Sequence, residues 1–146
     1  MASHHVIVDG ANVAYAERSQ DGEPKVANLV AMCEALEEQG YEPTVIVDAS
    51  LRYEVSDPEQ LEALLDDYEW QQAPAGTDAD YFILEIAERL DGYVVSNDEF
   101  DRWAEEHPGI EERRVPFMIV RGEVILQKEK LGGRTGAEGE AGEGRA

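Results

Sequence analysis

Short apolar runs alternate with longer segments of helical periodicity along this chain. The runs lie at His4–Val8, Thr44–Val47, Tyr93–Val95 and Phe117–Val120, and we expect each to form a β-strand. A strand with one solvent-exposed face alternates apolar and polar residues. The first two runs lack this alternation, which indicates that both of their faces are buried. Strands that alternate with helices form a mostly parallel sheet covered by helices on both sides. The sequence therefore predicts an α/β protein with three α/β/α layers.

The helical segments carry start and end signals in addition to their periodicity. We expect a helix between Pro24 and Gly40, one that begins at Asp57-Pro58, one over Tyr81–Leu90 and a short one over Phe100–Glu106. The remaining expected elements are a loop over Gln71–Thr77 and a hairpin strand over Glu123–Leu126, which follows a turn at Arg121-Gly122.

Length and composition fit one domain with a polar tail. The chain has 146 residues, of which 42% are hydrophobic, and this is enough to fill one core. Residues 132–146 hold six of the 13 glycines and almost nothing apolar, so we expect a folded domain over 1–131 and a disordered tail over 132–146. No apolar run approaches a membrane span, no signal peptide is recognisable, and Cys33 is the one cysteine. These features predict a cytoplasmic protein without a membrane partner or a disulfide framework.

The formal net charge of −21 restricts the partners of this protein. Only three of the 12 basic residues are lysines, and acids are spread along the whole chain, which suggests a halophilic protein that works in concentrated salt. Such a charge argues against nucleic-acid binding at low salt. At molar salt the Debye length falls to about 3 Å, so contact geometry then decides.

Carboxylates follow the ends of the expected strands. Asp9, Asp48 and Asp98 each come directly after or near the end of one strand. The carboxyl ends of parallel strands meet at one edge of a sheet, and a right-handed crossover starts the helix of Asp78 and Asp80 at that edge. Spacing from the apolar stripe of this helix places Asp80 on the face toward the sheet.

We therefore expect Asp9, Asp80 and Asp98 to converge and hold a metal ion. Crowded carboxylates raise one another's pKa, and a divalent cation relieves this repulsion. Oxygen ligands suit Mg²⁺ or Mn²⁺. Asp48 fits better as a turn residue or a helix cap.

Each acid also has an ordinary structural interpretation. Asp9 could belong to a turn, Asp80 to a capping box, and Asp98 could cap a helix. Asn12 could orient Asp9 or bind a phosphate, or it could be an ordinary helix-start residue, and Ser96 is equally open.

Half of the basic residues lie between positions 113 and 134. They are Arg113, Arg114, Arg121, Lys128, Lys130 and Arg134. On so acidic a chain this could be a stripe that follows RNA phosphates, or a charged strand edge that prevents aggregation. Arg52 follows the second strand and could also reach a phosphate.

Four motifs resemble those of the NYN ribonucleases in the PIN-like superfamily. They are VIVDGANVAY (Val6–Tyr15), DADYFILEIA (Asp78–Ala87), GYVVSNDEF (Gly92–Phe100) and IEER (Ile110–Arg113). The resemblance is to the Regnase-type catalytic domain of CCCH zinc-finger endoribonucleases, here without the zinc finger, and it runs from residue 6 to residue 134.

This resemblance implies a PIN-like fold and Mg²⁺- or Mn²⁺-dependent endonucleolytic cleavage of single-stranded or looped RNA. It implies that Asp9, Asn12, Asp80 and Asp98 are catalytic residues of an acidic centre and that Arg52 contacts RNA. The three aspartates are the expected metal ligands, and Arg113 and Arg114 of the basic stripe are further candidates for RNA contact. Asp78 and Asp101 are additional acidic candidates. Two positions depart from the family pattern: Ala79-Asp80 replaces adjacent aspartates, and Arg102 replaces a late aspartate.

Several alternatives follow from these departures. The first is a non-catalytic RNA-binding or adaptor module that keeps the fold. A haloacid-dehalogenase phosphatase needs an aspartate where Ala11 stands, and a receiver domain needs a late lysine where Arg121-Gly122-Glu123 stands. A toxin of the same superfamily stays open, as does a homodimer.

Overall fold

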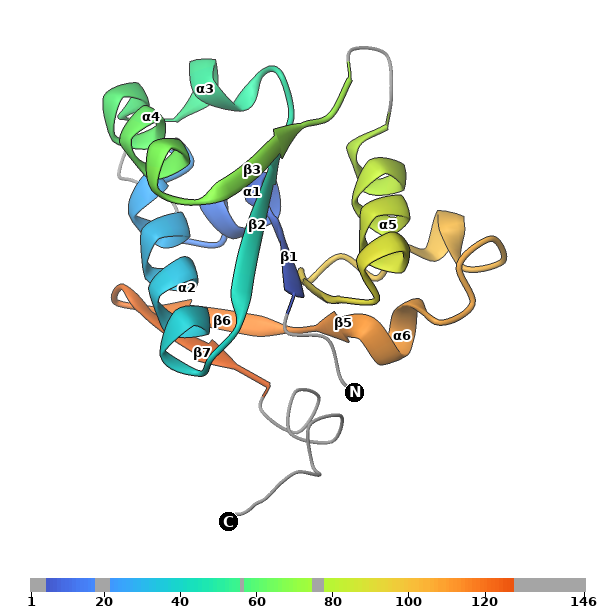
Figure 1. Cartoon of the computed structure of the whole chain (residues 1–146). Helices are drawn as coiled ribbons and strands as arrows, with labels where there is room; N and C mark the ends of the chain where they lie inside the picture. Colours follow the sequence, from blue (N-terminus) through green and yellow to red (C-terminus); the bar gives the residue numbers. More distant parts are fainter. Residues whose placement is uncertain (1–4, 18–21, 56, 75–77, 128–146) are drawn as a thin grey trace.

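A five-stranded parallel sheet forms the centre of the computed structural model, which describes residues 5–17, 22–55, 57–74 and 78–127 (Figure 1). The strands are β1 (His5–Asp9), β2 (Glu42–Val47), β3 (Glu69–Gln72), β4 (Tyr93–Val95) and β5 (Arg114–Val115). Their spatial order is β3-β2-β1-β4-β5. The chain therefore builds the sheet outward from β1 in one direction and then returns to add β4 on the other side. This change of direction creates a crevice beyond the carboxyl ends of β1 and β4.

Helices cover both faces of this sheet, as the alternation of strands and helices predicts. On one face lie α2 (Val26–Glu38) and α4 (Pro58–Asp67), and on the other lies α5 (Ala79–Leu90) (Figure 1). Successive side chains of a strand point to opposite faces, so Val6 and Val8 join the core under α2 while Ile7 joins the core under α5. The predicted three-layer α/β/α fold is confirmed.

The short helix α1 (Gly10–Ala14) begins directly after β1, where the sequence indicated a turn. Asp9 caps it, because the Asp9 carboxylate accepts a hydrogen bond from the backbone N–H of Asn12. Gly10 passes so close to β2 that a Cβ there would lie 2.5 Å from the carbonyl oxygen of Ile46. The close approach of these two backbones requires glycine and aims α1 across the end of the sheet.

Asn28 fixes the other end of α1 from inside the protein. It lies on α2, is 2% exposed, and its side-chain amide donates to the carbonyl oxygens of Val13, Ala14 and Glu17 at 3.2, 3.0 and 2.9 Å. These carbonyls lie at the end of α1 and just after it, and those of Val13 and Ala14 also accept from the backbone N–H groups of Ala16 and Lys25. Asn28 therefore sets the position of the helix that carries Asn12.

Two expected elements are wrong in part. Gln71 and Gln72 belong to the edge strand β3 and not to a loop, because pairing with β2 orders a short exposed segment in which Trp70 is the one apolar residue. The helix expected over Phe100–Glu106 is one 3₁₀ turn over Asp101–Trp103 (η1), because Phe100 has a φ of 56° and cannot begin a right-handed helix. Residues 75–77 of the expected loop lie outside the described residues.

Three short elements have no counterpart in the sequence prediction. They are α3 (Leu51–Glu54), α6 (Ile110–Arg113) and β5, each four residues or fewer. Elements this short carry too few residues for a periodic pattern.

The predicted hairpin forms a separate two-stranded sheet of β6 (Phe117–Val120) and β7 (Glu123–Leu126). Its turn residues Arg121 and Gly122 both have positive φ, and their backbone N–H groups donate to the carboxylate of Glu17. The tail over 132–146 lies outside the described residues. Within the described ranges, no helix has the length and apolar character needed to cross a membrane.

Candidate active site

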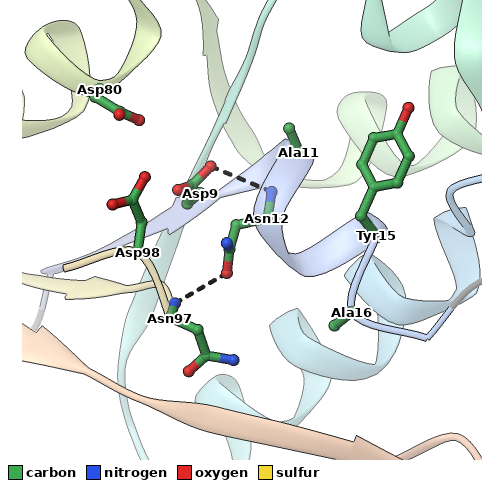
Figure 2. A pocket seen from close by; sticks show the side chains of 8 residues that line it. All are labelled: Asp9, Ala11, Asn12, Tyr15, Ala16, Asp80, Asn97 and Asp98. Carbon is green, nitrogen blue, oxygen red and sulfur yellow. Dashed lines mark hydrogen bonds between the residues drawn. The ribbon is translucent and has the colours of Figure 1, made fainter. Parts of the chain in front are cut away.

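An acidic pocket opens beyond the carboxyl ends of β1 and β4, at the place where the strand order changes direction. It is lined by Asp9, Ala11, Asn12, Tyr15, Ala16, Asp80, Asn97 and Asp98 (Figure 2). The carboxylates of Asp80 and Asp98 point toward the same space as that of Asp9 (Figure 2). The structure thus brings together the four residues that the sequence singled out as catalytic, and their catalytic roles stay a prediction.

Asp9 is the most deeply placed acid of the pocket. It ends β1, is 7% exposed, and its carboxylate accepts hydrogen bonds from Ser96 Oγ at 2.9 Å and from the Asn12 N–H at 3.3 Å. The pKa of Asp9 is raised to about 6, mainly by burial and also by the like charges of Asp98 and Asp48, while the two hydrogen bonds act in the opposite direction.

Asp80 lies in the first turn of α5 and faces Asp9 and Asp98. Its pKa is raised to about 7, first because the carboxyl is partly buried and then because Asp98, Asp9 and Asp78 carry like charges nearby. A hydrogen bond with Asp98 also favours the protonated form. Like charges on neighbouring segments therefore destabilise the charged forms of Asp9 and Asp80.

A hard divalent cation fits this donor set. The described lining includes no lysine or arginine, so no side chain there neutralises the three carboxylates. Carboxylate oxygens with room for water are the ligands that Mg²⁺ and Mn²⁺ prefer. Asp9, Asp80 and Asp98 are accordingly the residues that could hold such an ion.

Ser96 and Asn97 fix the segment that carries Asp98. Ser96 is fully buried, and its hydroxyl donates to Asp9 and accepts from the backbone N–H of Asp98 at 3.0 Å. Asn97 donates its backbone N–H to Asn12 Oδ1, and its side-chain amide pairs with both the N–H and the carbonyl oxygen of Phe117, each at 2.9 Å. The sequence left the role of Ser96 open, because its partner Asp9 lies far away in the chain.

The two additional acidic candidates occupy different positions. Asp78 caps α5 by accepting from the N–H of Asp80 at 3.0 Å, and it also pairs with Arg102 at 3.2 Å. Asp101 lies in the 3₁₀ turn and is not part of the described pocket lining. Asp78 therefore acts on the pocket through its negative charge, which lies close to Asp80.

None of the predicted RNA-contacting arginines is part of the described pocket lining. Arg52 pairs with Glu62 at 3.3 Å. Arg113 pairs with Asp91 at 3.0 Å, at the amino end of β4 and thus at the opposite end of this strand from the pocket. Arg114 lies nearer, since its guanidinium is 3.5 Å from the carbonyl oxygen of Ser96.

The rest of the basic stripe is divided. Arg121 lies in the turn of the β6–β7 hairpin, while Lys128, Lys130 and Arg134 lie outside the described residues. RNA contact by any of these side chains stays a prediction.

The raised pKa of Asp9 predicts a specific pH dependence of stability without metal. The folded state keeps the Asp9 proton up to a pKa of about 6, whereas the unfolded state releases it near 3.8. This stabilisation is therefore complete below pH 3.8 and is lost as the pH rises through 6. Relative to Asp9→Asn, the wild-type protein should lose about 2–3 kcal/mol of unfolding free energy between pH 4 and pH 8.

The measurement is urea unfolding of both proteins in EDTA at several pH values. Comparing them cancels the titration of shared groups that do not interact with Asp9; Asp80 does interact with it, so its titration belongs to the measured difference. Stability curves that run parallel from pH 4 to pH 8 would show that Asp9 is not the destabilising charge.

Comparisons with known proteins agree with the α/β fold and indicate one family. A family model described as the Zc3h12a-like Ribonuclease NYN domain matches residues 2–140. Two structures of the nuclear protein-only RNase P 2 (PRORP2) of Arabidopsis thaliana superpose with TM-scores of 0.64 and 0.66 at 21% and 23% identity. Each superposition covers 84% of this chain and 29% of the plant protein, so the likeness concerns the fold and under a third of the plant chain. No curated protein sequence gives a significant match.

Proposed function

This chain belongs to the Zc3h12a-like ribonuclease NYN domain family, and on that premise we propose that it is a metal-dependent endoribonuclease acting on single-stranded or looped RNA. The observation that carries the proposal is the convergence of Asp9, Asp80 and Asp98 on one pocket at the change in strand order. RNA is the substrate class of the family. The metal dependence, the internal position of cleavage and the preference for unpaired RNA are the finer parts of the proposal.

Asp9, Asp80 and Asp98 would hold the ion, Mg²⁺ or Mn²⁺. When bound, such an ion lowers the pKa of a water molecule and offsets the charge that develops on the phosphoryl oxygens. Ser96 Oγ and the Asn12 N–H keep the Asp9 carboxylate in one orientation. Asp80, in the first turn of α5, would bind the ion directly or through a water molecule that its carboxylate orients.

Binding of RNA by this domain should be weak at low salt. The described lining of the pocket is acidic, and the whole chain carries a net charge of −21. The phosphate backbone would be repelled until salt screens these charges or a partner supplies basic side chains. We therefore expect cleavage to be more efficient at high salt, in contrast to most RNA-binding proteins.

A circular single-stranded RNA is the most direct test of this function. Only an endonuclease can convert it into a linear product, because a circle has no ends. We expect linear product with Mg²⁺ or Mn²⁺ in concentrated KCl and none with EDTA. RNA that is bound but not cut under every metal condition would overturn the proposal.

That outcome would favour the alternative, a non-catalytic RNA-binding or adaptor module. One observation supports this alternative. Arg102 stands where the family pattern has an aspartate, and its guanidinium pairs with Asp78, which adjoins the pocket. Arg102 therefore takes the place of a carboxylate that could bind the metal ion, and its positive charge partly neutralises Asp78.

The domain boundary at residue 131, a homodimer, a cytoplasmic location and adaptation to concentrated salt stay predictions from the sequence.

A further inference from the structure

A second group of metal-ligating side chains lies outside the acidic pocket. It consists of Glu85 and Glu88, one turn apart on α5, and His107, which follows the 3₁₀ turn. One ligand atom from each residue lies within 4.8 Å of the other two. None of the three lines the acidic pocket, and the two glutamates lie about 8 and 12 Å further along the helix axis than Asp80.

The imidazole of His107 is buried without a hydrogen bond. Its side chain is 4% exposed, yet neither ring nitrogen has a hydrogen-bond partner within the described structure. Burying polar nitrogens in this way costs free energy unless another ligand satisfies them. Such a group therefore needs a physical explanation.

Each ring nitrogen of His107 lies close to a carboxylate oxygen. His107 Nδ1 lies 2.8 Å from Glu88 Oε2, and Nε2 lies 3.6 Å from Glu85 Oε2. The first contact is short enough for a hydrogen bond, but its direction is not that of an N–H donating to the oxygen. A metal ion bound to Nδ1 would satisfy this nitrogen, with Glu88 as the second ligand, and Glu85, which faces the other ring nitrogen, would join after rotation of its side chain.

We propose that Glu85, Glu88 and His107 form a second metal site that binds a transition-metal ion of the Zn²⁺ class. An imidazole with two carboxylates suits Zn²⁺, Co²⁺ or Ni²⁺, whereas Mg²⁺ prefers oxygen ligands alone. Three protein ligands leave a fourth tetrahedral position for water. Glu85 and Glu88 are partly exposed, so an ion can reach the site from solvent.

An ion at this site would join two segments that each carry a pocket acid. Glu85 and Glu88 belong to α5, whose first turn carries Asp80, while His107 belongs to the segment that follows Asp98. The rings of Tyr81 on α5 and Trp103 on the other segment already pack with centroids 5.3 Å apart. The metal would therefore hold Asp80 and Asp98 at a fixed separation without touching either of them.

The test compares Zn²⁺ binding by the wild-type chain and by the double variant Glu85→Gln/Glu88→Gln. Excess Mg²⁺ is present throughout, so that the acidic pocket does not take up zinc. Both proteins are dialysed against buffered Zn²⁺, and bound zinc is counted by atomic absorption. The matched control is Glu34→Gln/Glu38→Gln, which removes the same charge from exposed positions of α2. Both changes replace exposed or partly exposed side chains, so the fold should persist.

We expect the wild-type chain and the control to bind one zinc ion that the double variant loses, with affinity weakened by at least about 100-fold. The nitrogen resonances of the His107 ring should shift with zinc in a His4→Gln/His5→Gln background, where His107 is the one remaining histidine. Equal zinc binding by the double variant would overturn the proposal. His107 resonances that do not shift when zinc is added would overturn it as well. They would indicate that the ring forms ion pairs with the two glutamates and binds no metal.

Discussion

Asp9→Asn should lower metal-dependent RNA cleavage by roughly 1,000-fold or more, equivalent to about 4 kcal/mol of transition-state stabilisation. Asp9 is the acid nearest to full burial in the pocket, and an amide offers one neutral oxygen where the carboxylate offers two charged ones. The fold should remain, because asparagine has the same shape and its oxygen can still accept from Ser96 Oγ. A loss of activity in a fully folded protein is therefore the expected result.

Single-turnover cleavage measures this effect, and thermal unfolding in EDTA checks the fold. Asp67→Asn is the matched control, since it removes one carboxylate from the exposed end of α4 and should leave the rate unchanged. Cleavage at the wild-type rate by Asp9→Asn would exclude Asp9 from the chemistry, whatever the outcome at the second metal site.

Asn28→Asp should destabilise the protein by about 4 kcal/mol near pH 8. The substitution keeps the shape of the side chain but removes both N–H donors that hold the carbonyls of Val13, Ala14 and Glu17. It also places a buried negative charge against three carbonyl oxygens, and an unpaired buried charge costs about 3–5 kcal/mol. This exceeds what one lost hydrogen bond would cost.

Urea unfolding in EDTA measures this loss, with Gln60→Glu on the exposed surface of α4 as the control for one added charge. The deficit of Asn28→Asp should shrink toward pH 4, because a protonated carboxyl is neutral and can donate once. A variant that matches the wild-type stability at both pH values would show that these hydrogen bonds do not hold α1.

The strands β1, β2 and β4 were predictable because a strand buried in a parallel sheet must be apolar on both faces. The same physics explains why β3 was not predictable. It is an edge strand with every residue exposed, so its order comes from the backbone of β2 and not from its own side chains. The central strands were therefore enough to predict the fold class, but they did not reveal the edge strand β3 and so did not give the number of strands in the sheet.

The convergence of Asp9 and Asp98 was predictable for a similar reason, since topology alone brings the ends of neighbouring parallel strands together. The functions of Ser96 and Asn97 were not, because they depend on partners such as Phe117 that the sequence does not place. His107 was missed because its neighbours Glu85 and Glu88 have the pattern of an ordinary solvated helix surface. Pairwise contacts between distant segments were thus the information that the sequence alone did not supply.

The described lining of the acidic pocket comes from two stretches of the chain and one residue of α5, and none of it comes from residues 22–74. This segment supplies α2, β2, α3, α4 and β3, and it supports the pocket through contacts with α1 and its flanks. The Ile46 carbonyl lies against Gly10, Asn28 holds the end of α1, and Glu54 accepts a hydrogen bond from the Tyr15 hydroxyl. The protein is thereby divided into a chemical part and a supporting part. Relatives could therefore diverge across the exposed surface of the supporting part while they keep the side chains that hold α1 and the acidic pocket in place.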